Sequence, residues 1–380
     1  MTDFDFLHNR KETGSVKWDY YASRDIIPLW VADADFQSPP CILDALRKTI
    51  DFGIFGYSNA SKSCSEAFIN YTQSRHQLKI EPNEIFWLPG LVCALNAVCR
   101  AFAGPSDEIL SFSPIYPPFL TSPANSDQIS VPVPMDYDGS TWSLNLGTLR
   151  QAITPRSKVL LLCNPYNPLG KVFTKEELLE IADICLEHKI IICSDEVHCD
   201  LILNPAKKHI PIASLSSEIA QNTITLMAPS KTWNIAGLGC SVAHIPNITL
   251  RRRFIKTCNH VVPDPNLLGL IAVEAAYTDG EAWRLELIDY LRANYKLIET
   301  FLKKELPQLT LSPLDATYLA WIDFSKSGLT NPPRQLEAAG IGLSSGKPFG
   351  RADFMRLNFA CPRPLLEKAL IRLRNCLLNT

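Results

Sequence analysis

The sequence has no surplus of basic residues and no long hydrophobic run. Lysine and arginine together number 37, aspartate and glutamate 39, and the formal net charge is −2. A nucleic-acid-binding chain would carry a basic excess, so we expect no nucleic-acid partner. No stretch of about 18 uncharged apolar residues occurs, which predicts no transmembrane helix and no membrane partner. The first fifteen residues are polar and charged, unlike a signal peptide, so we expect a cytoplasmic protein.

Closely spaced cysteine pairs are also missing. The chain has 12 cysteines but no C-x-x-C pair, and several stand inside apolar stretches, as Cys163 does in VLLLCNP and Cys193 in IIICSDE. Cysteines in such surroundings behave as small buried hydrophobes in a reducing compartment. We therefore expect neither a disulfide framework nor a metal site.

The length and the order of the predicted elements indicate two domains. A chain of 380 residues exceeds the size at which a single core normally stops growing. Apolar strands alternate with a helical pattern in the middle of the chain, which favours a three-layer, doubly wound α/β domain with a mostly parallel sheet. Long amphipathic helices and two strands near the C-terminus indicate a smaller α+β domain. We predict an N-terminal arm and part of the small domain at 1–40, the large domain at 41–278 and the small C-terminal domain at 279–380.

Three polar residues follow three successive predicted strands. Asn167 lies in NPYNPLG, Asp195 ends IIICSD, and Lys231 stands in APSKTWN. Because ligands of such folds bind where the strands end, we expect the three side chains to face one crevice. Pyridoxal 5′-phosphate (PLP) needs this set: a lysine for its aldehyde, a carboxylate for its pyridine nitrogen and a donor for its phenolic oxygen. Taken singly, the three residues also fit plainer roles as a turn-former, a strand-end carboxylate and a surface lysine.

Several longer motifs resemble one enzyme family. The motifs that resemble fold-type-I PLP enzymes related to class I/II aminotransferases are DEVH at 195–198, SKTWN at 230–234, NPYNPLG at 164–170 and RLNFACPR at 356–363. Those that resemble the MalY/PatB branch of cystathionine β-lyases include SVKWDYY at 15–21, PLWVADADF at 28–36 and LSSGKPFG at 343–350. The resemblance covers essentially the whole chain. It implies the fold-type-I architecture, in which the large domain binds PLP.

The resemblance also implies roles around the cofactor ring. Lys231 would bind the cofactor aldehyde and later carry the substrate proton. Asp195 would pair with the pyridinium nitrogen, and Asn167 would donate to the ring oxygen. Tyr116, in SPIYPPF, matches the aromatic residue that stacks on the ring. The Asn167–Pro168 bond is a candidate cis peptide.

Further positions match the phosphate and substrate sites of the family. The backbone amides of Leu91 and Val92, in PGLVCALN, would begin a helix and bind the phosphate, with the Ser230 hydroxyl beside them. Arg356 matches the arginine that binds the substrate α-carboxylate through two parallel donors. Tyr57, in FGY, matches a tyrosine that enters the partner subunit's site. The resemblance therefore implies a homodimer with shared active sites.

The type of reaction depends on fewer residues. Ordinary class I/II aminotransferases have DEVY, whereas the fourth residue here is His198, which resembles the C–S lyase branch. We therefore expect α,β-elimination from L-cystathionine or a related sulfur amino acid, giving a thiol, pyruvate and ammonia. Transamination of an amino acid with a keto acid is the alternative, since both reactions start from the same carbanion. A regulatory role through protein binding is a lesser alternative.

Several residues differ from those usual in the branch, among them Ser58 and Asn59 after FGY and the GRADFMR stretch before RLN. Ala34 stands in the place of a methionine, Tyr166 in the place of a histidine, and Leu169 in the place of a threonine or valine. We expect these positions to line or flank the substrate pocket. They leave the identity of the amino-acid substrate open.

Overall fold

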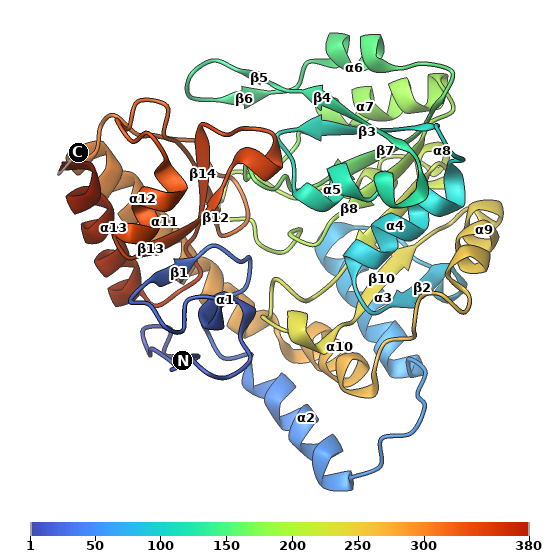
Figure 1. Cartoon of the computed structure of the whole chain (residues 1–380). Helices are drawn as coiled ribbons and strands as arrows, with labels where there is room; N and C mark the ends of the chain where they lie inside the picture. The colour runs from blue at the N-terminus through green and yellow to red at the C-terminus, as the bar shows by residue number, and fades with distance from the viewer. Residues whose placement is uncertain (1, 379–380) are drawn as a thin grey trace.

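Figure 1 shows the computed structural model of the chain, which describes residues 2–378. Its larger sheet has seven strands in the order β2-β10-β9-β8-β7-β3-β4. The strands from β9 to β4 run parallel, and β10 is antiparallel to both of its neighbours. Their bounds are β2 Ile85–Leu88, β3 Glu108–Ser113, β4 Ile129–Pro134, β7 Ser157–Cys163, β8 Ile191–Asp195, β9 Thr223–Met227 and β10 Ser241–His244. The predicted α/β fold with a large, mostly parallel sheet is confirmed.

The central strands are apolar because neighbouring elements cover them. All of β9 is buried, as is all of β7 except one residue. Helix α4 (Leu91–Phe102) packs against β7 to β10, and α7 (Lys175–Glu187) packs against β8. Helix α7 begins at a capping box, in which Thr174 Oγ1 accepts from the Glu177 amide and the Glu177 carboxylate accepts from the Thr174 amide.

A second sheet joins the start of the chain to its last third. It has five strands in the order β1-β13-β14-β12-β11. Their bounds are β1 Ile27–Leu29, β11 Thr310–Leu311, β12 Leu319–Asp323, β13 Ile341–Ser345 and β14 Phe354–Asn358. Because β1 pairs in parallel with β13, the N-terminal segment is built into this smaller sheet. A short hairpin of β5 (Asp136–Tyr137) and β6 (Trp142–Ser143) completes the described strands.

The remaining helices surround the two sheets (Figure 1). Their bounds are α1 Val16–Asp19, α2 Pro40–Phe52, α3 Lys62–His76, α5 Pro117–Thr121, α6 Leu146–Ala152, α8 Ser217–Gln221, α9 Ile248–Cys258, α10 Leu267–Asp279, α11 Glu281–Glu305, α12 Pro332–Ala338 and α13 Arg363–Leu378. Between residues 2 and 378, no helix combines the length and the apolar character needed to span a bilayer. Cys163 and Cys193 are buried free thiols, as expected.

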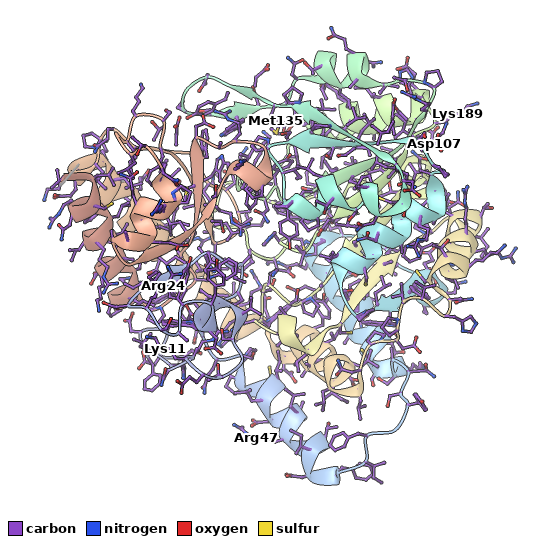
Figure 2. The ribbon with its side chains drawn as sticks, in the orientation of Figure 1. Lys11, Arg24, Arg47, Asp107, Met135 and Lys189 are labelled. Carbon is purple, nitrogen blue, oxygen red and sulfur yellow. The ribbon has the colours of Figure 1, made fainter. Side chains whose placement is uncertain are left out.

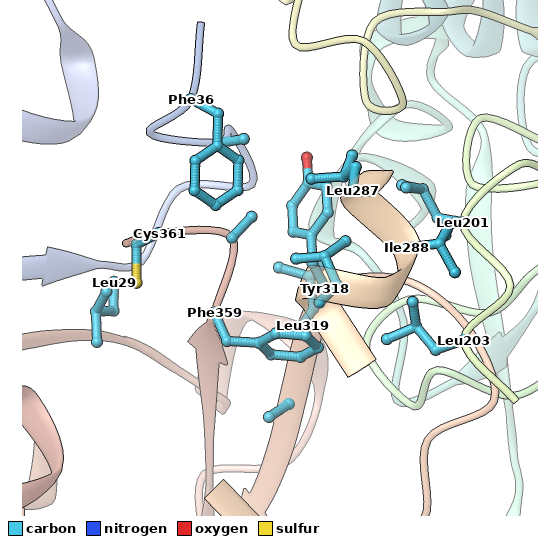
Figure 3. Close-up of a cluster of buried hydrophobic side chains, with 14 of the residues drawn as sticks. Leu29, Phe36, Leu201, Leu203, Leu287, Ile288, Tyr318, Leu319, Phe359 and Cys361 are labelled. Carbon is cyan, nitrogen blue, oxygen red and sulfur yellow. The ribbon is translucent and has the colours of Figure 1, made fainter. Parts of the chain in front are cut away.

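A continuous apolar cluster connects the N-terminal segment to the smaller sheet. Figure 3 shows Phe36 near Tyr318 and Leu29 beside Cys361, with Leu319 of β12 and Leu287 of α11 in the same cluster. All six side chains are almost completely buried. Leu29 and Phe36 therefore anchor the N-terminal segment against α11 and the smaller sheet.

The large sheet has two distinct edges. Asp107 and Lys189 precede β3 and β8, and both lie at the upper right in Figure 2. Strands β7 and β8 end at the opposite edge, at Cys163 and Asp195. In α/β folds the carboxyl edge is where ligands bind, so the site is to be sought there.

Candidate active site

The carboxyl ends of three neighbouring strands open onto one cavity. In register, Cys163 of β7 lies opposite Asp195 of β8, and Asp195 lies opposite Leu226 of β9. The cavity has a volume of about 190 Å3. The expected site residues that line it are Leu91, Val92, Tyr116, Asn167, Asp195, His198, Ser230 and Lys231. The fold thus gathers side chains that are far apart in the sequence.

A tight turn after β7 carries Asn167 into the cavity. The Asn167–Pro168 bond is cis, as predicted. Gly170 ends the turn at φ 65°, and a Cβ on it would lie 2.9 Å from the Ala316 carbonyl oxygen. Since no other residue could approach so closely with this backbone, glycine is required at this position. The turn is therefore packed against the segment that leads into β12.

Two of the branch departures, Tyr166 and Leu169, lie in this turn rather than on the cavity wall. Tyr166 is fully buried and packs edge-on against Phe173, with ring centroids 5.9 Å apart. Leu169 is also buried, and neither side chain lines the cavity. Ala34 is buried in the N-terminal segment. None of these three residues lines the cavity.

Helix α4 points its N-terminus at the cavity. Gly90 precedes the helix, and the first amide that bonds within it is that of Ala94, to the Gly90 carbonyl. The amides of Leu91 and Val92 therefore have no acceptor inside the helix, and both residues line the cavity. Ser230 lines the cavity too. Free amides at a helix start, together with a hydroxyl, suit a phosphate group.

Asp195 is a buried carboxylate with little compensation. Its side chain accepts one hydrogen bond, from the Val197 amide at 3.1 Å. Burial raises the pKa of Asp195 to about 6, although this hydrogen bond and the nearby Lys231 act in the opposite direction. A cation next to the carboxylate would reverse the shift. The site is therefore suited to a cationic partner such as a protonated pyridine nitrogen.

Lys231 follows β9 and reaches back across the cavity. Its Nζ donates to the Ala32 carbonyl at 2.7 Å. Burial lowers the pKa of Lys231, with Asp33 raising it and Arg356 lowering it further. An amine with a depressed pKa is more readily available as a nucleophile or base at neutral pH.

Arg356, on β14 of the smaller sheet, faces the same region. Its Nη1 donates to the Asn167 side-chain oxygen at 3.0 Å and its Nη2 to the Trp30 carbonyl at 3.1 Å. The guanidinium also lies over the Phe349 ring, 4.7 Å from its centroid. Burial lowers the pKa of Arg356 to about 10. Since these partners are all uncharged, the positive charge remains available for an anionic ligand.

His198 and Tyr116 are two further expected residues that line the cavity. His198 is almost fully buried, its Nδ1 has no hydrogen-bond partner within residues 2–378, and its ring meets Tyr318 edge-on at 6.2 Å. Burial lowers the pKa of His198 to about 3, helped by Lys231 and Arg356, so the imidazole is neutral. Burial raises the pKa of Tyr116, which keeps its hydroxyl protonated.

Tyr57 lies apart from the other expected residues. It stands in the irregular segment between α2 and α3, its side chain is fully exposed, and it does not line the cavity. Within one chain, the structure therefore does not bring Tyr57 to the site.

The sequence alone did not point to several residues that contact the site. Trp30 and Ala32 contribute backbone carbonyls, Phe349 lies against Arg356, and Ser344 and Tyr318 contribute hydroxyls. The motifs PLWVADADF and LSSGKPFG contain four of the five, and the stretch TYLAWIDF at 317–324 contains Tyr318, but a sequence motif does not show which atoms face the site.

The residues of the cavity fit PLP. A buried carboxylate, a partly buried lysine and helix-start amides are the groups that the ring nitrogen, the aldehyde and the phosphate require. The buried polar atoms without partners, above all His198 Nδ1, would otherwise be costly. We conclude that the donor set is compatible with this cofactor.

Comparison with known proteins defines the class. A family model described as "Aminotransferase class I and II" matches residues 24–373, and the chain belongs to this family. Within it, the chain is 36% identical over 386 residues to the "Cystathionine beta-lyase PatB" of Bacillus subtilis (strain 168), covering 99% of this chain and 100% of that protein. The resemblance to the MalY/PatB branch is confirmed.

Solved structures agree with this assignment. OvoB is 42% identical with a TM-score of 0.96, covering 100% of both chains. Cystalysin from Treponema denticola is 31% identical with a TM-score of 0.96, covering 100% of this chain and 99% of that chain. Its crystal structure contains a pyridoxal 5′-phosphate cofactor.

We predict that Asp195→Asn stabilises the ligand-free protein at neutral pH. A carboxyl whose pKa is raised on folding costs stability as pH rises from its ordinary value to about 6, and the full cost remains above that pH. The amide avoids the cost, which amounts to roughly 3 kcal/mol at most. The melting temperature of the variant should therefore exceed that of the parent by an amount that grows from pH 4 to pH 7.

Glu108→Gln is the matched control. Glu108 is equally buried, but despite burial the hydrogen bonds from Thr154 and Arg156 lower the pKa of its carboxyl. This substitution should therefore destabilise the protein above about pH 5. If the difference in melting temperature between Asp195→Asn and the parent does not change with pH, the charge of Asp195 does not destabilise the folded protein.

Proposed function

We propose that the protein is a PLP-dependent C–S β-lyase that converts L-cystathionine or a related sulfur amino acid to a thiol, pyruvate and ammonia. The observation that carries the proposal is that Lys231 and Asp195 line one cavity and that Arg356 donates to Asn167 of its wall. The full-length similarity to a protein named cystathionine beta-lyase supports the reaction type.

We further propose the domain limits 1–40, 41–278 and 279–380. We also propose a cytoplasmic location, and the buried free thiols of Cys163 and Cys193 support this location.

In this proposal the cavity residues hold the cofactor. Asp195 pairs with the ring nitrogen, Asn167 donates to the ring oxygen and Tyr116 stacks on the ring. Leu91 and Val92 bind the phosphate through their amides, with the Ser230 hydroxyl. The burial of Asp195 and the open N-terminus of α4 support these assignments.

The reaction requires removal of the substrate α-proton. Arg356 binds the α-carboxylate, because its buried charge has only neutral partners in the chain. Lys231 accepts the proton from Cα, for which its lowered pKa suits it. When bound, the cofactor would supply an electron sink for the pair left on Cα, so that a Cα–Cβ double bond can form as the Cβ–S bond breaks. The thiolate then leaves from Cβ, and a thiolate is a good leaving group.

Transamination uses the same residues and differs in where the proton returns. The family includes aminotransferases, which keeps this reaction as the alternative. His198 is neutral and has no donor or acceptor at Nδ1 within residues 2–378. A tyrosine at this position would place a hydroxyl beside the ring. The histidine, together with the names of the relatives, supports elimination.

We also propose a homodimer in which Tyr57 enters the partner's site. Large apolar side chains are exposed at the end of α2 and after it, namely Ile50, Phe52, Ile54, Phe55 and Tyr57. In Figure 1 α2 and the following segment extend away from both sheets, and in Figure 2 Arg47 of α2 lies at that extremity. An apolar group of this size on a projecting element is typical of an interface.

Purified protein should release pyruvate from L-cystathionine without any keto acid. We expect pyruvate, ammonia and thiol in equal amounts, because elimination consumes one substrate and needs no acceptor. The measurement combines lactate dehydrogenase coupling with thiol titration. If no sulfur amino acid yields pyruvate while an amino acid and a keto acid react readily, the protein is an aminotransferase.

Complementation tests the shared site. Tyr57→Ala and Lys231→Ala should each be nearly inactive, since one removes the group contributed to the partner and the other the proton acceptor. Mixed dimers have one site with both defects and one site with neither. Co-expression should therefore restore activity, to about half per mixed dimer. Exposed Tyr20→Ala serves as a control that should be active alone. An inactive mixture of soluble dimers would contradict a Tyr57 contribution across the interface.

A further inference from the structure

One backbone segment contacts both cations of the site. Residues 30–36, called the carbonyl segment here, run from the end of β1 toward α2. Lys231 Nζ, from the larger sheet, donates to the Ala32 carbonyl at 2.7 Å. Arg356 Nη2, from the smaller sheet, donates to the Trp30 carbonyl at 3.1 Å. The relative position of the two cations therefore depends on where this segment lies.

An asparagine next to Arg356 binds the same segment. Asn358 lies two residues further along β14, so its side chain is on the same face as that of Arg356. It is fully buried, and its Nδ2 donates to the carbonyls of Val31 at 2.5 Å and Asp33 at 2.7 Å. Its Oδ1 accepts from the Ala360 amide at 2.8 Å. Asn358 thus hydrogen-bonds to the carbonyl segment on both sides of Ala32.

A second asparagine, close to Lys231 in the sequence, hydrogen-bonds to the other end of the carbonyl segment. Asn234 lies three residues after Lys231, at φ 56°, a region that asparagine tolerates well. Its Oδ1 accepts from the Ala34 amide at 3.1 Å, and its Nδ2 donates to the carbonyls of Ala34 at 3.1 Å and Phe36 at 2.6 Å. Each cation is therefore followed in the chain by an asparagine that binds the segment the cation itself contacts.

The carboxylates of the segment are engaged elsewhere. Asp35 accepts from Lys17 at 2.8 Å, Trp18 at 2.7 Å and Arg10 at 2.7 Å, and Asp33 is paired with Arg10 at 3.0 Å. The segment consequently offers neutral carbonyls to Lys231 and Arg356. A carbonyl satisfies their hydrogen bonds without cancelling their charge, whereas a carboxylate would compete with the substrate.

We propose that Asn358 and Asn234 are positioning residues, which hold the carbonyl segment so that it orients Arg356 for the substrate carboxylate and Lys231 for the α-proton. Tyr318 supports the same point, because its hydroxyl donates to the Ala32 carbonyl at 3.1 Å, and Figure 3 shows its ring close to Phe36. The inference rests on the proposed function for what the two cations do. It adds that the two asparagines affect different steps: Asn358 affects binding of the substrate, and Asn234 affects transfer of the α-proton.

The test compares three variants of the cofactor-loaded enzyme. Asn358→Leu removes the amide beside Arg356, and Asn234→Gly removes the other amide while allowing the positive φ. Gln128→Met is the control, because Gln128 is a buried amide that donates to two backbone carbonyls, of Cys99 and Ala103, and does not line the cavity. The probe for binding is L-alanine, which has no leaving group on Cβ, titrated by visible absorbance.

We expect Asn358→Leu to raise the Kd for L-alanine and the KM for substrate by about tenfold or more, with kcat changing much less. Asn234→Gly should lower kcat by about tenfold or more and leave the Kd for L-alanine nearly unchanged. Gln128→Met should lower only the melting temperature. Should Asn358→Leu be insoluble, Asn358→Ser removes the same two donors.

The inference is overturned if both asparagine variants keep the parental Kd and kcat while melting earlier, as Gln128→Met does. Equal loss of both parameters in both variants would also overturn it, since the two asparagines would then affect the same steps. Failure of the proposed function is separate, because it appears as absence of pyruvate in the parent enzyme. The Kd for L-alanine can be measured whether the parent is a lyase or an aminotransferase.

Discussion

The site depends on charges that are buried but not neutralised. Asp195 and Lys231 line one small cavity, and Arg356 donates to Asn167 of its wall. The contacts of the three groups within residues 2–378 are mostly with backbone groups and an amide. Burying a charge without an opposite charge is expensive, and the shifted pKa values of all three groups express that cost. A bound cofactor and substrate would supply the missing charges. The free-energy cost of the unpaired charges in the free protein is relieved on binding, which increases the affinity for the ligands.

Holding such charges in place requires both sheets. Lys231 and Asp195 come from the carboxyl edge of the large parallel sheet, and Arg356 comes from β14 of the smaller sheet. The N-terminal arm is the connecting element, because β1 joins the smaller sheet while Asn234 binds the residues after it. The beginning of the chain, which looks irregular in sequence, is therefore what sets the distance between the two cations.

The sequence predicted the cofactor side of the site better than the substrate side. Asn167, Asp195 and Lys231 were predictable because each follows an apolar run, and the order of parallel strands brings strand ends together. The carbonyls of Trp30 and Ala32 were not predictable, since every residue has a carbonyl and only the fold selects which one faces a cation. Tyr57 was predicted only by resemblance, because a residue proposed to act across an interface would leave no spacing signal within its own chain.

The central claim is that Lys231 carries the cofactor in this cavity. Sodium borohydride treatment of the purified protein, followed by proteolysis and mass spectrometry, tests it most directly, because reduction fixes the cofactor to the lysine that binds it. We predict one modified peptide, containing APSKTWN with the added mass on Lys231, and loss of the visible absorbance. Modification of a different lysine, or an unmodified Lys231 in protein that contains the cofactor, would contradict the account.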